Sequence, residues 1–312
     1  MLEVLSITAP IFIIISVGYL SVRSGLISQD AMPLLGRFVL YFSLPALIFG
    51  TLSSMQVSEV IQIDFLAIYA IGSLATLLTG IILHRLLFGT RSVAASLYGM
   101  GMSVSNSAFI GYPVLMQVFG EPPTQPFTMA IIVETALILP IALVLLEYGK
   151  QDSSEDGSLL KIWRRILARV IRNPLIIAIL AGLIFSGLQI PLPDTLDRSL
   201  EMLAMTSAGT ALFIIGGSLV GIRISDSLGS TGLVAVGKLL MHPFFMFILV
   251  MLWRDFDPQL QKAVVLAAAM PMFSMFPVIA GSFGYGRPCA GMLLATTALS
   301  FVTLTSLLAI LG

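Results

Sequence analysis

The stretch Tyr112-Pro-Val-Leu-Met-Gln-Val-Phe-Gly120 has a second copy, Phe276-Pro-Val-Ile-Ala-Gly-Ser-Phe-Gly284, that begins 164 positions later. Each copy places a proline inside an apolar segment of membrane-spanning length. The same offset relates three further pairs of residues: Pro10 and Pro174, Gly18 and Gly182, Ser43 and Ser207. One offset that serves several segments predicts two homologous halves, each with a proline-broken membrane helix. Paired interruptions of this kind point to a binding site near the middle of the bilayer.

The composition bounds the class of protein. The chain of 312 residues is 57% hydrophobic and only 10% charged, which is typical of a protein that crosses a lipid bilayer many times. Its one cysteine, Cys289, excludes an intramolecular disulfide and a cysteine-based metal site. The 16 basic and 16 acidic residues balance, so we expect no nucleic-acid partner.

Ten apolar windows are long enough to be membrane helices, for which about 20 residues are needed. Their unbroken apolar character favours helices over the alternating strands of a barrel. The windows lie near residues 4–22, 32–52, 65–87, 92–119, 127–147, 174–188, 200–220, 232–253, 261–283 and 289–311.

The basic residues between these windows predict the orientation. Three of them lie in the even-numbered connections, and eleven lie in the odd-numbered ones. The eleven are Arg23, Arg85, Arg91, Lys150, Lys161, Arg164, Arg165, Arg169, Arg172, Arg223 and Arg287. By the positive-inside rule the odd connections are cytoplasmic, and both termini lie outside.

This orientation also predicts the domain organisation. Residues 1–149 form a first five-helix repeat, residues 150–171 a cytoplasmic linker with a basic amphipathic helix, and residues 172–312 a second five-helix repeat. Because five is odd, the second repeat is inserted upside down relative to the first. The predicted fold is therefore an all-α membrane protein of two inverted repeats, with broken helices 4 and 9.

The fourth window carries the richest polar sequence. Asn106 is one of two asparagines in the chain, and Ser105 precedes it. Pro113 lacks a backbone donor and Gly111 permits non-helical geometry, so we expect an unwound stretch from Asn106 to Pro113. Such a stretch is tolerated in a membrane where it lines a cavity enclosed by protein.

Pro113 and Pro277 each suit the first turn of a second half-helix. Inverted symmetry would bring these two starts together, and their unpaired N–H groups and positive dipole ends would favour an anion. A simple kink at each proline is the alternative.

Among the ionisable residues inside predicted spans, three are candidates for function: Glu134, Lys238 and His242. Intramembrane ionisable groups are functional candidates, and Lys238 and His242 share one helix face at a spacing of four. We take all three as candidates for coupling. Lys238 could instead extend to the cytoplasmic surface, and His242 could be a packing residue.

Signatures of an enzyme are missing from the sequence. It has no His-Glu-x-x-His motif, and Gly101-Met-Ser-Val-Ser105 lacks the last glycine of a nucleophile elbow. A continuous polar stripe, as in a channel, is also missing. We expect neither catalytic residues nor a metal site.

At Asn106-Ser-Ala-Phe-Ile-Gly-Tyr-Pro113-Val-Leu-Met-Gln-Val-Phe-Gly120 the chain resembles the auxin efflux carrier family, including its plant PIN-type members and bacterial relatives, within the bile acid/auxin/arsenite transporter superfamily. The shared pattern is Asn-x4-Gly-x-Pro with a later aromatic-Gly pair. The resemblance implies a homodimer that carries organic anions by an elevator-like motion. It implies that helices 1, 2, 6 and 7 form a scaffold and helices 3–5 and 8–10 a transport domain.

The resemblance and the breaks together predict the substrate-binding residues: Asn106, Ser105, Gly111, Tyr112, Pro113, Ser274, Phe276 and Pro277. No amide side chain near Ser274 mirrors Asn106, and the short linker favours a bacterial type in the inner membrane. We expect a secondary transporter for a small mono- or dicarboxylate, with no cofactor other than a coupling proton or sodium ion. A sodium-coupled bile-acid-type symporter and a channel are the alternatives.

Overall fold

The computed structural model describes residues 2–55, 61–120, 123–150, 164, 167–168, 170–222, 228–253 and 256–311. Over these ranges the chain consists of helices and connecting turns, with no β-strand, which confirms the predicted all-α class. The predicted linker and amphipathic helix, residues 150–171, lie mostly outside these ranges.

Six helices in the described part are long and apolar enough to cross a membrane. They span Ala31–Ser54, Ile63–Phe88, Thr124–Gly149, Asp194–Ser218, Leu228–Leu252 and Gly286–Leu311. Shorter apolar helices at Ala9–Arg23, Ser107–Phe119 and Pro174–Gly187 fall in the first, fourth and sixth predicted windows. The chain is a multi-pass membrane protein, whereas ten spans in two inverted repeats stay a prediction.

The chain divides into two compact units, and each takes residues from both halves of the sequence. Unit 1 comprises Met1–Ile63, Ala108–Ile131 and Ile171–Gly221. Unit 2 comprises Asp64–Ser107, Ile132–Val170 and Ile222–Gly312.

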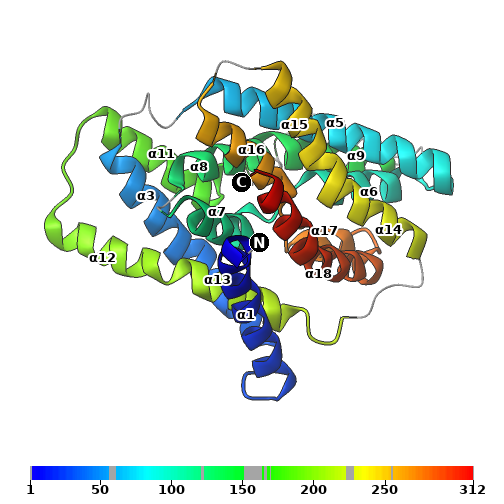
Figure 1. Ribbon diagram of the computed structural model, residues 1–312, viewed down its shortest axis with the longest axis horizontal. Coiled ribbons are helices and arrows are strands. Elements are labelled where there is room, and N and C mark those ends of the chain that lie inside the picture. The colour runs from blue at the N-terminus through cyan, green and yellow to red at the C-terminus, as the bar shows by residue number, and fades with distance from the viewer. Residues whose placement is uncertain are drawn as a thin grey trace. The chain divides into compact units, whose positions relative to one another are not determined.

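The helices of unit 1 pack in two close pairs (Figure 1). They are α1 (Leu2–Arg23), α2 (Ala31–Phe38), η1 (Val39–Ser43), α3 (Leu44–Ser54), α7 (Tyr112–Phe119), α8 (Thr124–Val133), α11 (Pro174–Gly187), α12 (Asp194–Met205) and α13 (Ser207–Ser218). Helix α1 packs on α13, and α11 packs on α3. Gly18 and Gly216 permit the first contact, because a Cβ at either would overlap the backbone of the facing helix.

Unit 2 contains the remaining elements. They are α5 (Ile63–Phe88), α6 (Ser92–Ser103), η3 (Glu134–Ile138), α9 (Leu139–Lys150), α14 (Leu228–Val236), η4 (Gly237–Met241), α15 (His242–Leu252), α16 (Pro258–Ala269), α17 (Phe276–Gly281) and α18 (Gly286–Leu311). Helix α6 packs on α9, and α16 packs on α18. Small residues again allow close approach: Gly99 of α6 faces the backbone carbonyl of Leu77 in α5.

Four five-residue π-helical turns, η1 to η4, share one sequence feature, a proline two residues after the turn ends. These prolines are Pro45, Pro113, Pro140 and Pro243. A proline lacks the N–H donor, and its ring clashes with the carbonyl four residues earlier, so a wider turn accommodates that carbonyl without breaking the helix.

The expectation of an unwound stretch from Asn106 to Pro113 is therefore wrong in position. The interruption covers Val104 to Asn106, and η2 (Ser107–Gly111) leads directly into α7. The second half-helix thus begins at Ser107, six residues before Pro113, because the π-turn absorbs the effect of the proline. The ninth window is also interrupted, between Ala269 and Phe276, and there Pro277 does lie in the first turn of α17.

Candidate functional site

The two interruptions cross one another within unit 2. Ser105 and Met272 form an isolated antiparallel bridge, and the backbone N–H of Asn106 donates to the carbonyl of Pro271 at 2.8 Å. Ser105, Asn106 and Met272 are almost fully buried. Two stretches of non-helical backbone thereby satisfy part of each other's hydrogen-bonding capacity in a place that water does not reach.

Glu134, in the fifth segment, lies beside the start of the second half-helix of the fourth segment. One oxygen, Oε1, accepts hydrogen bonds from Tyr69 Oη at 2.7 Å, Ser107 Oγ at 2.8 Å and the backbone N–H of Ser105 at 3.2 Å. The π-turn η3 begins at Glu134 itself. An acidic group beside the N-terminal end of a half-helix complements the positive end of the helix dipole.

Lys238 lies beside the C-terminal end of helix α16. Its Nζ donates to the carbonyl of Ala268 at 2.7 Å, and that carbonyl is one of those that the last turn of α16 leaves without an intrahelical partner. It also donates to Ser105 Oγ at 2.8 Å and to His242 Nδ1 at 2.8 Å. An ammonium group has three hydrogens, so these partners use its full donor capacity.

His242 and Ser73 extend this network. His242 Nε2 lies 3.0 Å from Ser73 Oγ. A lysine ammonium that donates to His242 Nδ1 requires the ring proton to be on Nε2. Lys238, His242 and Ser73 are each fully buried. The alternative in which Lys238 reaches the membrane surface is therefore wrong, since η4 directs its side chain into the interior of unit 2.

We name these residues the crossing network: Tyr69, Ser73, Ser105, Ser107, Glu134, Lys238 and His242. Ser105 is its central member, since its N–H bonds to Glu134 and its Oγ bonds to Lys238. Sequence reasoning identified the three ionisable members. It missed Tyr69, Ser73 and Ser107, because a tyrosine or a serine in an apolar span carries no local signal of its partners.

Asn106 and Ser274 form a second polar pair at the crossing. Asn106 Nδ2 donates to Ser274 Oγ at 2.8 Å. Asn106 is buried, whereas Ser274 is partly exposed. Within the described part of the chain the Ser274 hydroxyl hydrogen has no acceptor, so this hydroxyl can donate to an incoming group.

The other predicted residues of the ninth segment lie next to this pair. Phe276 is fully buried and its ring packs against Gly101, where an added Cβ would be 2.8 Å from the ring. Pro277 follows it and is partly exposed. Phe276 thus packs inside the crossing, whereas Ser274 and Pro277 on either side of it are partly exposed.

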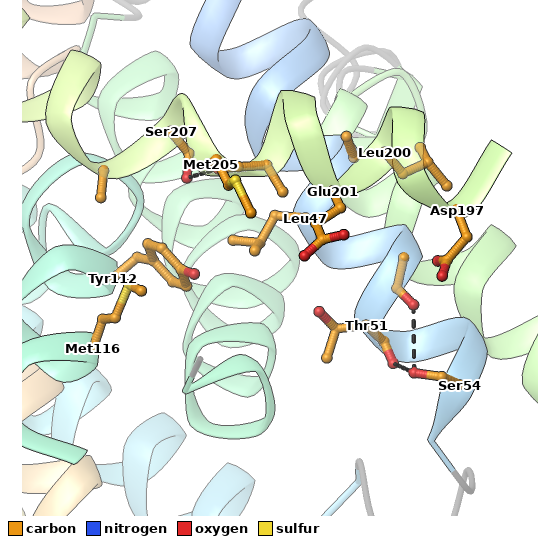
Figure 2. A pocket seen from close by; sticks show the side chains of 14 residues that line it. Leu47, Thr51, Ser54, Tyr112, Met116, Asp197, Leu200, Glu201, Met205 and Ser207 are labelled. Atoms are coloured by element: carbon orange, nitrogen blue, oxygen red, sulfur yellow. Dashed lines mark hydrogen bonds between the residues drawn. The ribbon is translucent and has the colours of Figure 1, made fainter. Parts of the chain in front are cut away.

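Three further predicted residues, Gly111, Tyr112 and Pro113, belong to unit 1. Gly111 and Pro113 are buried at the junction of η2 and α7. Tyr112 lies at a pocket of about 520 Å³, which Figure 2 shows from close by. The meeting of the Pro113 and Pro277 half-helices in one cavity stays a prediction.

The two serine-bearing segments that the sequence offset pairs, at Ser43 and Ser207, lie close together within unit 1. Ser43 Oγ lies 2.7 Å from Thr206 Oγ1, which links η1 to the start of α13 within unit 1. Ser207 lines the pocket. Two acidic residues of α12, Asp197 and Glu201, line it as well, and sequence analysis did not single them out.

The comparison with known proteins settles the family. The family model described as "Membrane transport protein" matches residues 4–308. The chain belongs to this family, that of the auxin efflux carriers. The predicted resemblance is confirmed, and the relatives described below are transporters or carriers by name, not enzymes.

Several curated relatives of this family align with most of the chain. A proposed malonate transporter of Rhizobium meliloti is 27% identical over 310 residues, which cover 99% of this chain and 96% of the relative. The uncharacterized transporter YfdV of Escherichia coli is 23% identical and covers 94% of this chain and 92% of its own length. Auxin efflux carrier component 8 of Arabidopsis thaliana is 23% identical over 69% of this chain and 71% of its own length.

Proposed function

We propose that this protein is a secondary active transporter for small carboxylates, with malonate or a similar dicarboxylate as substrate. The observation that supports it most is the crossing of two interrupted membrane segments at Ser105 and Met272, with a buried charged network around it. Broken helices whose ends meet inside the protein are the means by which transporters bind a polar solute at the middle of a membrane. The family and the proposed malonate transporter among its relatives support the choice of substrate class.

The substrate site is centred on Asn106 and Ser274. The Ser274 hydroxyl accepts from the Asn106 amide and keeps its own hydrogen for a carboxylate oxygen. Lys238 is a less suitable partner for the substrate in this conformation, because its three hydrogens are already used. That Gly111, Tyr112 and Pro113 also bind the substrate stays a prediction.

Two inverted five-helix repeats with both termini outside form the transporter. The packing within unit 1 supports this symmetry, because the offset of 164 residues places α1 on α11 and α3 on α13. The contact of α1 with α13 thereby corresponds to the contact of α11 with α3, as a two-fold axis in the membrane plane requires. Helices 1, 2, 6 and 7 form the scaffold of a homodimer, and helices 3–5 and 8–10 move as its transport domain in an elevator-like cycle.

The crossing network couples transport to a proton. A proton that reaches Glu134 would weaken its hold on Ser105 and Ser107, and so loosen one side of the crossing. The titratable groups that face Glu134 are Tyr69, directly, and Lys238 with His242, through Ser105. Protonation of Glu134 would therefore affect both its own hydrogen bonds and, through Ser105, those of Lys238 and His242.

The experiment is uptake of labelled malonate into liposomes that contain the purified protein. We expect saturable uptake that an inward proton gradient accelerates, and loss of uptake in Asn106→Ala. The matched control is Gln259→Ala, which truncates an exposed amide at the start of α16. Wild-type uptake by Asn106→Ala, with normal insertion of the variant, would overturn the placement of the site.

Coupling is tested separately with Glu134→Gln. We expect uptake by this variant to lose its response to the proton gradient, whereas Glu147→Gln, farther along the same span, keeps it. Uptake that follows a sodium gradient and ignores protons would instead favour the bile-acid type of symporter. Flux that does not saturate would favour a channel.

A further inference from the structure

The pocket of unit 1 has the opposite electrostatic character from a carboxylate site. The described residues that line it include two acids, Asp197 and Glu201, and no lysine, arginine or histidine. The two acids lie four residues apart on α12 and so share one face of that helix. Both are exposed, and within the described ranges neither has an ion-pair partner.

The hydroxyl of a nearly buried tyrosine is directed into the same space. Tyr112 is only 3% exposed, yet its hydroxyl has no hydrogen-bond partner among the described residues. Figure 2 shows the hydroxyl of Tyr112 and the carboxylate of Glu201 directed toward one another across the pocket, with Thr51 beside them. A hydroxyl at a pocket wall that no protein group satisfies is free to bond to a ligand, so this tyrosine points to an occupant that would complete its hydrogen bonding.

The rest of the wall is apolar. Leu47, Leu200, Ala204, Met205 and Met116 contribute carbon and sulfur surface. The volume of about 520 Å³ lies in the range of small-molecule sites. A ligand for this pocket therefore has an apolar body and a polar head.

The charge of the head follows from the acids. An anion would be repelled by Asp197 and Glu201, and a neutral alkyl chain would leave both carboxylates and the Tyr112 hydroxyl without a partner. A metal ion such as Ca²⁺ needs six to eight oxygen ligands, and the described residues hold no group of three or more metal-binding side chains. We propose that this pocket binds an organic ammonium ligand, whose cationic head bonds to Asp197 and Glu201 and whose apolar body packs against α3 and α7.

Tyr112 serves this ligand in two ways. Its hydroxyl accepts from the ammonium or donates to a neighbouring oxygen, and its ring offers a face for a cation–π contact. Phe127 holds that ring, with the two ring centres 5.3 Å apart. The site is thus complete within unit 1 and does not depend on the proposed carboxylate transport.

The first test measures binding of three probes that share one alkyl chain to the purified full-length protein. The probes are hexylammonium, hexanol and hexanoate, and the readout is the shift in unfolding temperature with probe concentration. We expect saturable stabilisation by hexylammonium alone. Equal stabilisation by all three probes, or no saturable effect of hexylammonium, would overturn the proposal.

The second test uses variants that remove the charge at constant shape. In Asp197→Asn/Glu201→Gln the dissociation constant for hexylammonium should rise about tenfold or more, as for the loss of hydrogen bonds to charged groups. Asp194→Asn, on the same helix but outside the pocket lining, is the matched control and should bind as the wild type does. An unchanged dissociation constant in the double variant would refute the assignment.

A third measurement needs no variant, so it holds even if the double variant does not fold. A water-soluble carbodiimide with an added amine labels accessible carboxylates, and mass spectrometry locates the label. Hexylammonium should protect Glu201 and Asp197 in the wild type and leave Asp194 labelled. Protection of all three acids to the same degree, or of none, would contradict the proposed site.

Discussion

The crossing network of unit 2 and the pocket of unit 1 differ in how far their polar groups are hydrogen-bonded within the protein. At the crossing, Glu134 Oε1 accepts three hydrogen bonds and Lys238 Nζ donates three. In the pocket, the hydroxyl of Tyr112 and the carboxylates of Asp197 and Glu201 have no such partners among the described residues. Groups that are satisfied internally hold a structure together, whereas groups that are left open are available to a ligand.

The largest expected effect comes from Lys238→Met, which breaks the crossing network. The change leaves Glu134 without its buried counterpart and the Ala268 carbonyl without a donor, so transport should be lost and stability should fall by about 3 kcal/mol. Glu134→Gln/Lys238→Met should recover part of that stability, because no unpaired charge remains buried. Unfolding and uptake measurements check both, with the exposed Lys262→Met as control. A single variant as stable as the wild type would show that the network does not hold the crossing.

A comparison of two glycines in α13 tests the packing of unit 1. Gly216→Ala places a methyl group against the carbonyl of Ile15 and should cost about 1–3 kcal/mol, as overpacking does. Gly209→Ala meets no atom within 4 Å and should be neutral or stabilising by up to about 1 kcal/mol, because alanine favours helix. The unfolding temperatures of the two variants, measured against the wild type, test this difference. Equal effects would mean that α1 and α13 are not in close contact.

The proline after each π-turn provides the next test. Pro243→Ala removes the cause of η4 and should let this turn return to regular α-helix, which displaces Lys238 from Ser105 and reduces uptake several-fold. Pro10→Ala, at an exposed site in α1, should change uptake little. Full uptake by Pro243→Ala would show that the wide turn is not needed to place Lys238.

Two tyrosines give the smallest and most direct comparison between the units. Tyr69→Phe removes a hydroxyl that donates to Glu134 and should cost about 1–2 kcal/mol. Tyr112→Phe removes a hydroxyl without an internal partner and should leave the free energy of unfolding almost unchanged, while hexylammonium binds several-fold more weakly. A larger stability loss at Tyr112 than at Tyr69 would reverse the interpretation of both sites.

Sequence reasoning predicted much of the fold because the strongest signals were local. Apolar runs predicted the long helices, and the two proline-bearing copies predicted that the fourth and ninth segments are interrupted. The position of the first interruption was wrong, since Pro113 widens the helix into η2 and the break lies at Val104–Asn106. A sequence shows that a proline disturbs a helix, but it does not show whether the helix responds by unwinding or by widening.

The candidate site was predicted only where a residue type is rare in a membrane. Glu134, Lys238, His242 and Asn106 are conspicuous in apolar segments, and all four lie at the crossing. Tyr69 and Ser73 bond to them from α5, a helix whose sequence gives no sign of these partners. Asp197 and Glu201 were overlooked because acids near the end of a span resemble ordinary surface residues. The pocket beside them is formed by four packed helices, α3, α7, α12 and α13.

The π-turns have a consequence for every residue that follows them. Each contains one residue more than an α-helix needs, and one residue corresponds to about 100° of rotation around the helix axis. A helical wheel drawn without interruption through Val133 and Leu139, or through Val236 and His242, therefore assigns the later residues to the wrong side by about that angle. Which side chains of these spans face lipid and which face protein can be decided only after the surplus residue has been counted.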